Sequence, residues 1–293
     1  MPEIQPGILA PVPAHARYLC LAAVPGSDLG AALGALKGLA DGNRVVVGLG
    51  RALVLALGHD IAGLTGFPRD GAANIEVAST PAALWCWLRE DDRGELILRS
   101  RAIEKALSAA FRVCQTIDAF RHGSGRDLTG YEDGTENPKD AAAVAAATVQ
   151  GQGGGLDGAS FVAVQQWVHD FDRFEAMTTA EQDNAIGRRR TDNEELDEAP
   201  PSAHVKRTAQ ESFDPGAFVL RRSMPWADEH AAGLVFVAFG KSFAAFEALL
   251  GRMIGAEDGV TDALFTFTRP VTGAYFWCPP MKGLQLDLSA VGL

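Results

Sequence analysis

Apolar residues recur along the chain in short runs of two kinds, some continuous and β-rich and some at helical spacing. Continuous runs predict strands, and apolar residues three or four positions apart predict helices. The first half accordingly predicts a strand over 17–24, a helix over 29–39, two strands within 44–57, a helix opened by Thr80-Pro81 and carrying Leu84, Trp85 and Leu88, and a helix over 100–114.

The second half of the chain shows the same order of patterns. It predicts a strand over 161–168, a helix over 178–187 capped by Thr178 or Thr179, strands over 217–223 and 233–240, a helix over 242–254 and a strand over 273–278. An Ala-rich and then Gly-rich segment, 139–158, separates the halves. Its glycine run is not followed by the Gly-Lys-Ser/Thr of a phosphate-binding loop, so it predicts a flexible connection.

This repeat predicts an α+β protein built from two ferredoxin-like modules, of the type that forms dimeric α+β barrels. We expect an N-terminal module over residues 1–130 and a C-terminal module over residues 131–293. Each would be an antiparallel sheet with peripheral helices. The space between sheet and helices could hold a flat, apolar cofactor.

Composition narrows the class of protein. The 293 residues are 47% hydrophobic and 22% charged, as in ordinary soluble globular proteins. The net charge of −11 argues against nucleic acid or an anionic membrane as partner. The N-terminal residues show no secretory pattern and no run reaches membrane-spanning length, which predicts a cytoplasmic protein.

Cysteine and histidine spacing points to no clustered metal site. The four cysteines form no Cys-x-x-Cys pair and are expected to be buried thiols. No two of the six histidines lie within four residues of each other. A single axial histidine is enough for haem, because the porphyrin supplies four nitrogens. Spacing alone leaves open which of the six would serve.

A Gly-x-x-Asp-Gly motif occurs four times, at residues 38–42, 130–134, 154–158 and 255–259. Asp-Gly is an ordinary turn pair, so the motif alone decides nothing. The second copy differs because it continues as Asp-Gly-Thr-Glu-Asn-Pro, residues 133–138, and follows Phe-Arg-His-Gly and Gly-Arg-Asp-Leu-Thr at 120–123 and 125–129. A carboxylate on such a tight turn can point a proton acceptor into a cavity.

The extended motif resembles the signature of the dye-decolourising peroxidases, in particular their bacterial P-class or B-type. Ser-Ala-His-Val-Lys-Arg, residues 202–207, resembles the family's proximal-histidine segment. Leu-Arg-Arg-Ser-Met-Pro-Trp at 220–226, followed by Gly-Leu-Val-Phe at 233–236, resembles its distal-arginine segment. The resemblance extends over most of the chain, from Gln5 to Gly273.

The resemblance implies one haem b per chain, bound in the C-terminal half, and assigns roles to individual residues. His204 would be the axial iron ligand, Asp133 the catalytic acid and base, and Arg221 the distal arginine. The other cofactor-binding residues implied are Arg207 as a propionate partner, Phe236 as a wall of the distal pocket, Thr135, and Asp262 as the acceptor behind His204. Where some relatives have asparagine, this chain has Ser223, which implies a weaker distal network.

Two of these assignments have alternatives in the sequence itself. Arg221 and Arg222 are neighbours on a predicted strand and therefore face opposite sides, and the match to Arg-x-Ser-Met-Pro favours Arg221 as the inward one. Asp262 could equally be a surface acid beside Asp258. Without the resemblance, His204 would be an exposed histidine in a polar loop.

The family implies a peroxidase that reduces hydrogen peroxide and oxidises dyes, phenols or similar one-electron donors through a ferryl intermediate. Electrons would arrive at the haem edge or through Tyr131, Trp226 or Trp277. The alternative is a haem-binding or iron-releasing, deferrochelatase-like protein without significant peroxide turnover. A third possibility is a cofactor-free α+β dimer that binds small molecules. A homo-oligomer is expected because ferredoxin-like sheets often associate.

Overall fold

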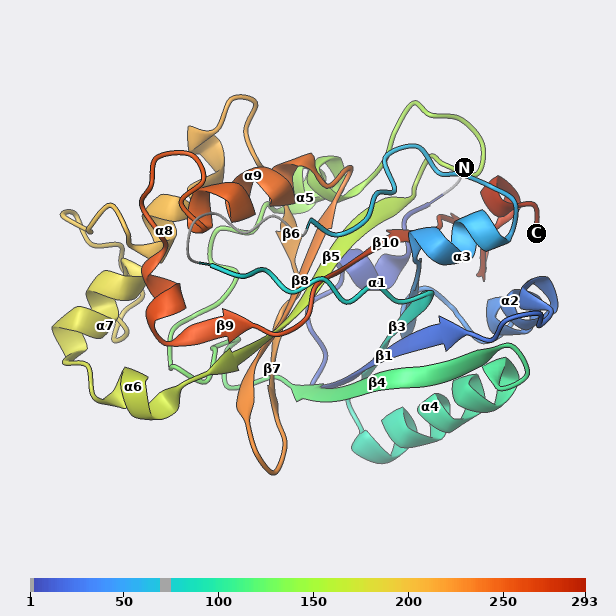
Figure 1. Cartoon of the computed structure of the whole chain (residues 1–293), viewed down its shortest axis with the longest axis horizontal. Coiled ribbons are helices and arrows are strands. Elements are labelled where there is room, and N and C mark those ends of the chain that lie inside the picture. The colour runs from blue at the N-terminus through green and yellow to red at the C-terminus, as the bar shows by residue number, and fades with distance from the viewer. Residues whose placement is uncertain (1–2, 69–74) are drawn as a thin grey trace.

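The computed structural model of the chain describes residues 3–68 and 75–293 (Figure 1). The elements up to residue 120 are α1 (Pro6–Leu9), β1 (His15–Ala23), α2 (Leu29–Lys37), β2 (Val45–Leu49), α3 (Arg51–Ala56), β3 (Leu84–Glu90), α4 (Arg93–Leu107) and β4 (Phe111–Phe120). The later helices are α5 (Asp140–Ala147), α6 (Phe171–Glu175), α7 (Thr179–Ile186), α8 (His204–Arg207), α9 (Ala244–Met253) and the 3₁₀ turns η1 (Gln210–Ser212), η2 (Ala263–Thr266) and η3 (Ser289–Val291). The later strands are β5 (Ser160–His169), β6 (Leu220–Arg221), β7 (Met224–Ala227), β8 (Ala232–Gly240), β9 (Thr268–Pro270), β10 (Ala274–Cys278), β11 (Met281–Lys282) and β12 (Gln285–Leu286).

The fold is α+β, with two ferredoxin-like halves that share one antiparallel barrel. Among the described residues, eight strands form a closed ring in the order β8-β7-β4-β1-β3-β2-β10-β5, because β5 also pairs with β8. The halves meet where β4 pairs with β7 and where β2 pairs with β10. Both halves therefore contribute to one sheet, and a module boundary at residue 130 stays a prediction.

Side chains alternate along each strand and so divide into an inner and an outer core. On β3, Trp85 and Trp87 point into the barrel, where they pack with Tyr18, Phe239 and Phe276. The barrel interior is therefore filled with aromatic side chains.

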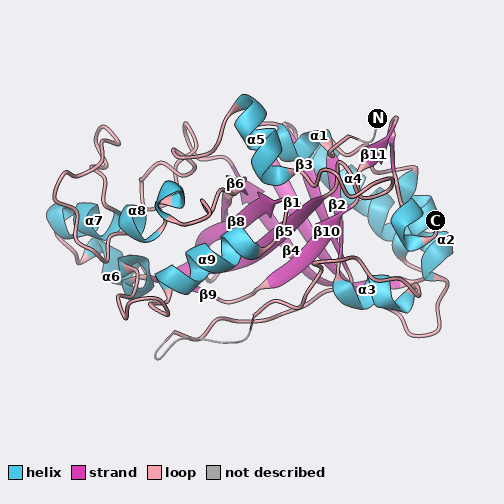
Figure 2. Cartoon of the chain, turned by 90° about the horizontal axis from the view of Figure 1, so that it is seen from above, coloured by secondary structure: helices cyan, strands magenta, loops and turns pink. Residues whose placement is uncertain are grey.

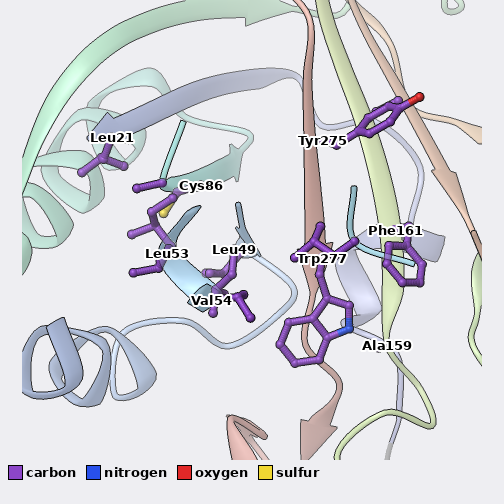
Figure 3. Packing of buried hydrophobic residues seen from close by; sticks show 14 of the residues in the cluster. Leu21, Leu49, Leu53, Val54, Cys86, Ala159, Phe161, Tyr275 and Trp277 are labelled. Atoms are coloured by element: carbon purple, nitrogen blue, oxygen red, sulfur yellow. The ribbon is translucent and has the colours of Figure 1, made fainter. Parts of the chain in front are cut away.

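The outer core lies between the barrel and its helices. It joins the outward residues of the strands to the apolar faces of α2, α4 and α9. Figure 3 shows part of it, with Trp277 of β10 close to Ala159 and Phe161, and Leu53 and Val54 of α3 beside Leu49. This packing leaves one end of the outer surface, near α9, for a cavity.

The helices are distributed unevenly around the barrel. In Figures 1 and 2, α6, α7 and α8 gather at one end of the molecule, with α9 lying along the sheet, while α2, α3 and α4 cover the other end. The segment between β5 and β6 therefore lies around part of the outer face of β5 and β8 and supplies residues such as Ile186, His204 and Gln210 to its surroundings. No helix among the described residues is long and apolar enough to cross a membrane.

The predicted second strand within 44–57 is wrong, because the chain turns into α3 directly after β2. Gly50 lies against β3 so closely that a Cβ atom there would be 2.0 Å from the carbonyl oxygen of Ala82. Beyond it Leu53 and Val54 are buried while Leu55 is 45% exposed, which is the one-sided pattern of a helix.

The helix predicted from Thr80-Pro81 is also wrong, since Leu84–Glu90 is strand β3. Residues 84 to 88 are all buried because β3 lies between the inner and outer cores. Apolar residues on both faces of a strand cannot be told from a helical stripe by periodicity.

The helix predicted over 100–114 begins earlier and ends earlier, as α4. Asp92 caps it by accepting the backbone N–H of Glu95, and the helix ends at Leu107. Phe111 and Cys114, which fall within the predicted range, belong instead to β4.

Several predictions in the second half are confirmed. β5, β8 and α9 lie where expected, and Thr178 caps α7 in a capping box with Glu181. The strand predicted over 217–223 shortens to β6, and β11, β12 and η3 follow β10. All four cysteines are free, and Cys114 is exposed rather than buried.

Candidate functional site

A cavity with mainly apolar walls lies on the outer face of β5 and β8, beneath α9. It holds about 1040 Å³ of space free of protein atoms, counted out to its mouth. The walls are mainly apolar, with a smaller group of polar side chains between them. The apolar lining consists of Trp167, Ile186, Val219, Leu234, Phe236, Phe246, Leu249, Leu250, Met253, Leu264 and Phe267.

Asp133, Arg221 and His204 all line this cavity, as does Phe236. They come from a turn, from β6, from α8 and from β8, respectively, so the fold brings together segments far apart in the sequence. Thr135 lines an adjoining cavity that shares Asp133, His204 and Arg221 with the first, and its hydroxyl accepts a hydrogen bond from Asn193 Nδ2 at 3.0 Å. Four of the sequence-predicted residues thus line one cavity, Thr135 lies beside it, and Asp262 and Arg207 are described below.

The structure separates Asp133 from the other three copies of the Gly-x-x-Asp-Gly motif. The carboxylates of Asp41, Asp157 and Asp258 each accept backbone N–H groups of nearby residues. Within the described residues, the Asp133 carboxylate accepts no hydrogen bond and forms no ion pair within 4 Å. It is therefore free to interact with an occupant of the cavity.

The turn around Asp133 depends on glycine and on Asn137. Gly130 and Gly134 have φ of 89° and 76°, a region that residues with a Cβ atom rarely adopt. Asn137 bonds the backbone of Arg221 twice, accepting from its N–H at 2.8 Å and donating to its C=O at 3.0 Å. This pair of bonds fixes the acidic turn against the strand that carries the arginine.

Arg221 faces the cavity, and Arg222 faces away from it. The guanidinium of Arg222 donates to the carbonyl oxygens of Ile8 and Leu9 at the N-terminal segment. Arg221 Nε is buried without a hydrogen-bond partner among the described residues. The choice of Arg221 as the inward residue agrees with this placement.

His204 and Asp262 form the most defined polar contact of the site. His204 Nδ1 lies 2.7 Å from Asp262 Oδ2, and the Asp262 side chain is completely buried. The other oxygen of Asp262 accepts the N–H of Leu264, and so caps η2. An ionised carboxylate only accepts, so Nδ1 is the donor in this contact, and Nε2 forms no hydrogen bond among the described residues.

Arg207 does not lie at the cavity, contrary to its predicted position beside a propionate. Its guanidinium is buried and holds both oxygens of Asp258 at 2.7 Å and the carbonyl of Arg252. The Arg207 pair lowers the pKa of Asp258 to about 2 through its side-chain hydrogen bond. Arg207 joins the helical turn of His204 to the loop after α9 that leads to Asp262.

A polar triad that sequence reasoning missed lies along the same wall. His169 Nε2 is 3.0 Å from Asp127 Oδ1, and His169 Nδ1 is 2.7 Å from the hydroxyl of Thr268. All three residues line the cavity, and Asp127 also accepts from Thr129. Burial, the largest single effect, raises the pKa of Asp127, but the hydrogen bond and electrostatic interaction with His169 and the hydrogen bonds from Thr129 together leave the pKa below its ordinary value.

Comparison with known proteins gives the class of the fold. The sequence model described as Dyp-type peroxidase, C-terminal, matches residues 124–283. A dye-decolorizing peroxidase from Mycobacterium tuberculosis is 30% identical over 233 residues, which are 78% of this chain and 68% of that protein. One from Mycolicibacterium paratuberculosis is 30% identical over 213 residues, 71% of this chain but only 60% of that protein.

Solved structures of other proteins resemble this structure over nearly the whole chain. A dyp-type peroxidase from Shewanella oneidensis has a TM-score of 0.89 at 28% identity, covering 96% of this chain and 97% of that one. A DypB variant from Rhodococcus jostii RHA1, solved in complex with heme, has a TM-score of 0.84 at 29% identity, covering 92% and 94%. The chain therefore belongs to the Dyp-type peroxidase family.

Proposed function

We propose that this chain is a haem peroxidase that reduces hydrogen peroxide and oxidises dyes, phenols or similar one-electron donors. The observation that carries the proposal is the imidazole of His204, which is held by buried Asp262 with its Nε2 available to a cavity that Asp133 and Arg221 also line. Family membership and the heme bound to the R. jostii DypB variant support it.

The residues of the cavity fit a haem. Its apolar walls suit a porphyrin, and a neutral histidine with a carboxylate behind it is a common axial ligand for iron. Arg221 Nε, buried without a partner among the described residues, calls for an acceptor that the protein itself does not provide. We therefore propose one haem b, bound through His204 and enclosed by Phe236, with Thr135 in the adjoining cavity.

A haem bound by His204 would supply the two-electron chemistry with peroxide and the one-electron chemistry with donors. Asp133 takes the proton from one peroxide oxygen on its carboxylate and gives it to the other, so that water leaves. Arg221 stabilises the negative charge that develops as the O–O bond breaks. Asp262 keeps His204 oriented and in one tautomer.

The proposal includes the cellular location and the oligomeric state of the enzyme. The four cysteines are free thiols, as is usual in a reducing compartment, which supports a cytoplasmic location. We also propose a homo-oligomer, because exposed ferredoxin-like sheets and helices often associate. Bulky donors would deliver electrons at the mouth of the cavity or through Tyr131, whose hydroxyl donates a hydrogen bond to Asp183 at 2.5 Å.

Replacing Asp133 with alanine tests the reaction. We expect the rate of peroxide consumption to fall by about 10²–10⁴-fold, the usual contribution of general acid and base catalysis, with haem affinity unchanged. Asp157→Ala is the matched control, because Asp157 occupies the same motif but bonds only its local backbone.

Peroxide consumption at the wild-type rate in Asp133→Ala would contradict the peroxidase mechanism. A wild-type chain that binds haem but consumes no peroxide would favour the alternative of a haem-binding or iron-releasing protein. Loss of haem from Asp133→Ala alone would show instead that the carboxylate contributes to binding.

A further inference from the structure

A second cavity lies on the other side of Asp133 and Arg221. It holds about 600 Å³ of space, again counted to its mouth, and it shares Asp133, Arg221 and Leu234 with the first cavity. His204 and the apolar residues of α9 line only the first one. The two cavities are therefore chemically different spaces that meet at the Asp133–Arg221 wall.

The second cavity is strongly basic. Among the described residues that line it, four are arginines, namely Arg121, Arg126, Arg221 and Arg222, and the single acid is Asp133. On a chain with a net charge of −11, this surplus of positive charge is local and unusual. The basic cavity is too local to attract an anionic macromolecule, because the rest of the molecular surface is acidic.

The hydrogen bonds of these arginines leave most of the positive charge without a counter-charge. Only Arg126 has an acid partner, Glu132, at 2.9 Å. Arg222 bonds carbonyl oxygens alone, which satisfy its N–H groups but carry no net charge. In the part of the chain that the structure describes, the side chains of Arg121 and Arg221 form no hydrogen bond or ion pair.

Burial makes this surplus costly. Burial first, and then the nearby charge of Arg89, lowers the pKa of Arg222 to about 10. A guanidinium that is partly removed from water interacts strongly with neighbouring charges, whether like or opposite. A negatively charged occupant would offset the repulsion among these side chains, as buried arginines generally require.

We propose that this second cavity binds a small monovalent anion, such as a halide, nitrite or a short carboxylate. Arg121 at the mouth and Arg221 at the floor supply the charged N–H donors. Ser223 lines the same space, and its Oγ lies 3.5 Å from the backbone nitrogen of Val237, so its hydroxyl proton is available to donate. Arg126 is paired with Glu132 and Asp133 offsets one further arginine, so two positive charges remain, and one small anion would neutralise one of them.

The proposed anion site does not depend on haem, since none of its donors requires one. Diffraction from crystals of the full chain soaked in bromide gives the most direct test, because bromine scatters anomalously. We expect an anomalous peak between Arg121 and Arg221. Broadening of the ⁸¹Br NMR line by the protein measures the same binding in solution.

The matched variants are Arg121→Gln and Arg101→Gln. Arg121 lies outside the haem cavity, and Arg101 is an exposed arginine of α4 that lines neither cavity. We expect bromide affinity to fall at least about tenfold in Arg121→Gln, which corresponds to the loss of one charge-assisted contact, and to stay unchanged in Arg101→Gln.

Three results would overturn the proposal. They are the absence of a peak in this cavity, a bromide peak confined to the haem side of Asp133, and equal bromide binding by the two variants. Haem binding by Arg121→Gln, measured alongside from its Soret absorption, shows whether the variant is folded and keeps the two proposals separate.

Discussion

At the scale of single residues, the site is defined by which polar groups have partners and which do not. Both His204 and Asp133 line the cavity. His204 uses Nδ1 to contact Asp262, and its Nε2 has no hydrogen-bond partner among the described residues. The Asp133 carboxylate likewise has no hydrogen-bond or ion-pair partner among them. Side chains with satisfied partners position the site. Those without partners are the ones that can act on a ligand.

The Asp127–His169 pair predicts a pH-dependent contribution to stability. The pKa of Asp127 in the folded chain lies below its ordinary value of 3.8, so the pair stabilises the protein above that pH and loses the effect as pH falls through the folded pKa. Asp127→Asn should cost about 1–3 kcal/mol at neutral pH, the usual cost of a buried, broken hydrogen bond.

This pH dependence is checked by urea unfolding of wild type and Asp127→Asn at a series of pH values that decreases from neutral pH. The difference in unfolding free energy should shrink once the pH passes below the ordinary pKa of an aspartate. Glu175→Gln, an exposed acid of α6, is the control and should show little change at any pH. A difference that stays constant over the acid range would contradict the assignment.

Sequence reasoning could find the residues of the site that lie in local motifs. Asp133, His204 and Arg221 each stand in a run whose neighbours are informative. The Asp127–His169–Thr268 triad could not be found, because its members are joined only by the pairing of β5 with β9 and by the turn before Asp133. Arg207 was assigned wrongly for the same reason, since its partner Asp258 lies 51 residues away.

At the scale of elements, the barrel forces β8 and β5 into unusually close contact beside the cavity. A Cβ atom on Gly233 would lie 2.1 Å from the carbonyl oxygen of Trp167 on β5. That oxygen is backbone and also accepts the indole N–H of Trp226, so it cannot move aside. Glycine at 233 is therefore required for the strand pairing that positions Trp167 and His169.

Gly233→Ala should destabilise the chain by about 1–3 kcal/mol, the typical cost of overpacking a rigid core. Gly251→Ala is the control, because no atom lies within 4 Å of its added methyl and it sits inside α9. That variant should be neutral or slightly more stable. Equal stability of the two variants in urea would show that β8 and β5 can separate without cost.

The elements also show where periodicity stops being informative. β5 and β8 were predictable because each is a β-rich run between polar turns. β3 was mistaken for a helix because the barrel buries both of its faces, and α3 for a strand because the turn at Gly50 is dictated by contact with Ala82. In each case the deciding contact comes from another part of the chain.

At the scale of the whole molecule, the two ferredoxin-like halves depend on each other. Leu49 of β2 pairs with Trp277 of β10, and Ala119 of β4 with Trp226 of β7, so each half closes the edge strands of the other. Neither residues 1–130 nor residues 131–293 should fold alone, because each would expose apolar strand edges and half of the inner core.

Scanning calorimetry of the intact chain and of the two halves tests this dependence. The intact chain should unfold in one cooperative transition. The separate halves should show no such transition and should aggregate. Cooperative unfolding of either half by itself would mean that the modules are autonomous domains.

The central claim is that His204 holds the iron of a haem in the cavity that Asp133 faces. Haem titration of wild type and His204→Gly, with and without added imidazole, tests it most directly. We expect His204→Gly to lose the wild-type Soret spectrum and its peroxide reaction, and imidazole to restore both by entering the space left by the side chain. A glycine variant that binds haem with the wild-type spectrum and affinity, without imidazole, would contradict the account.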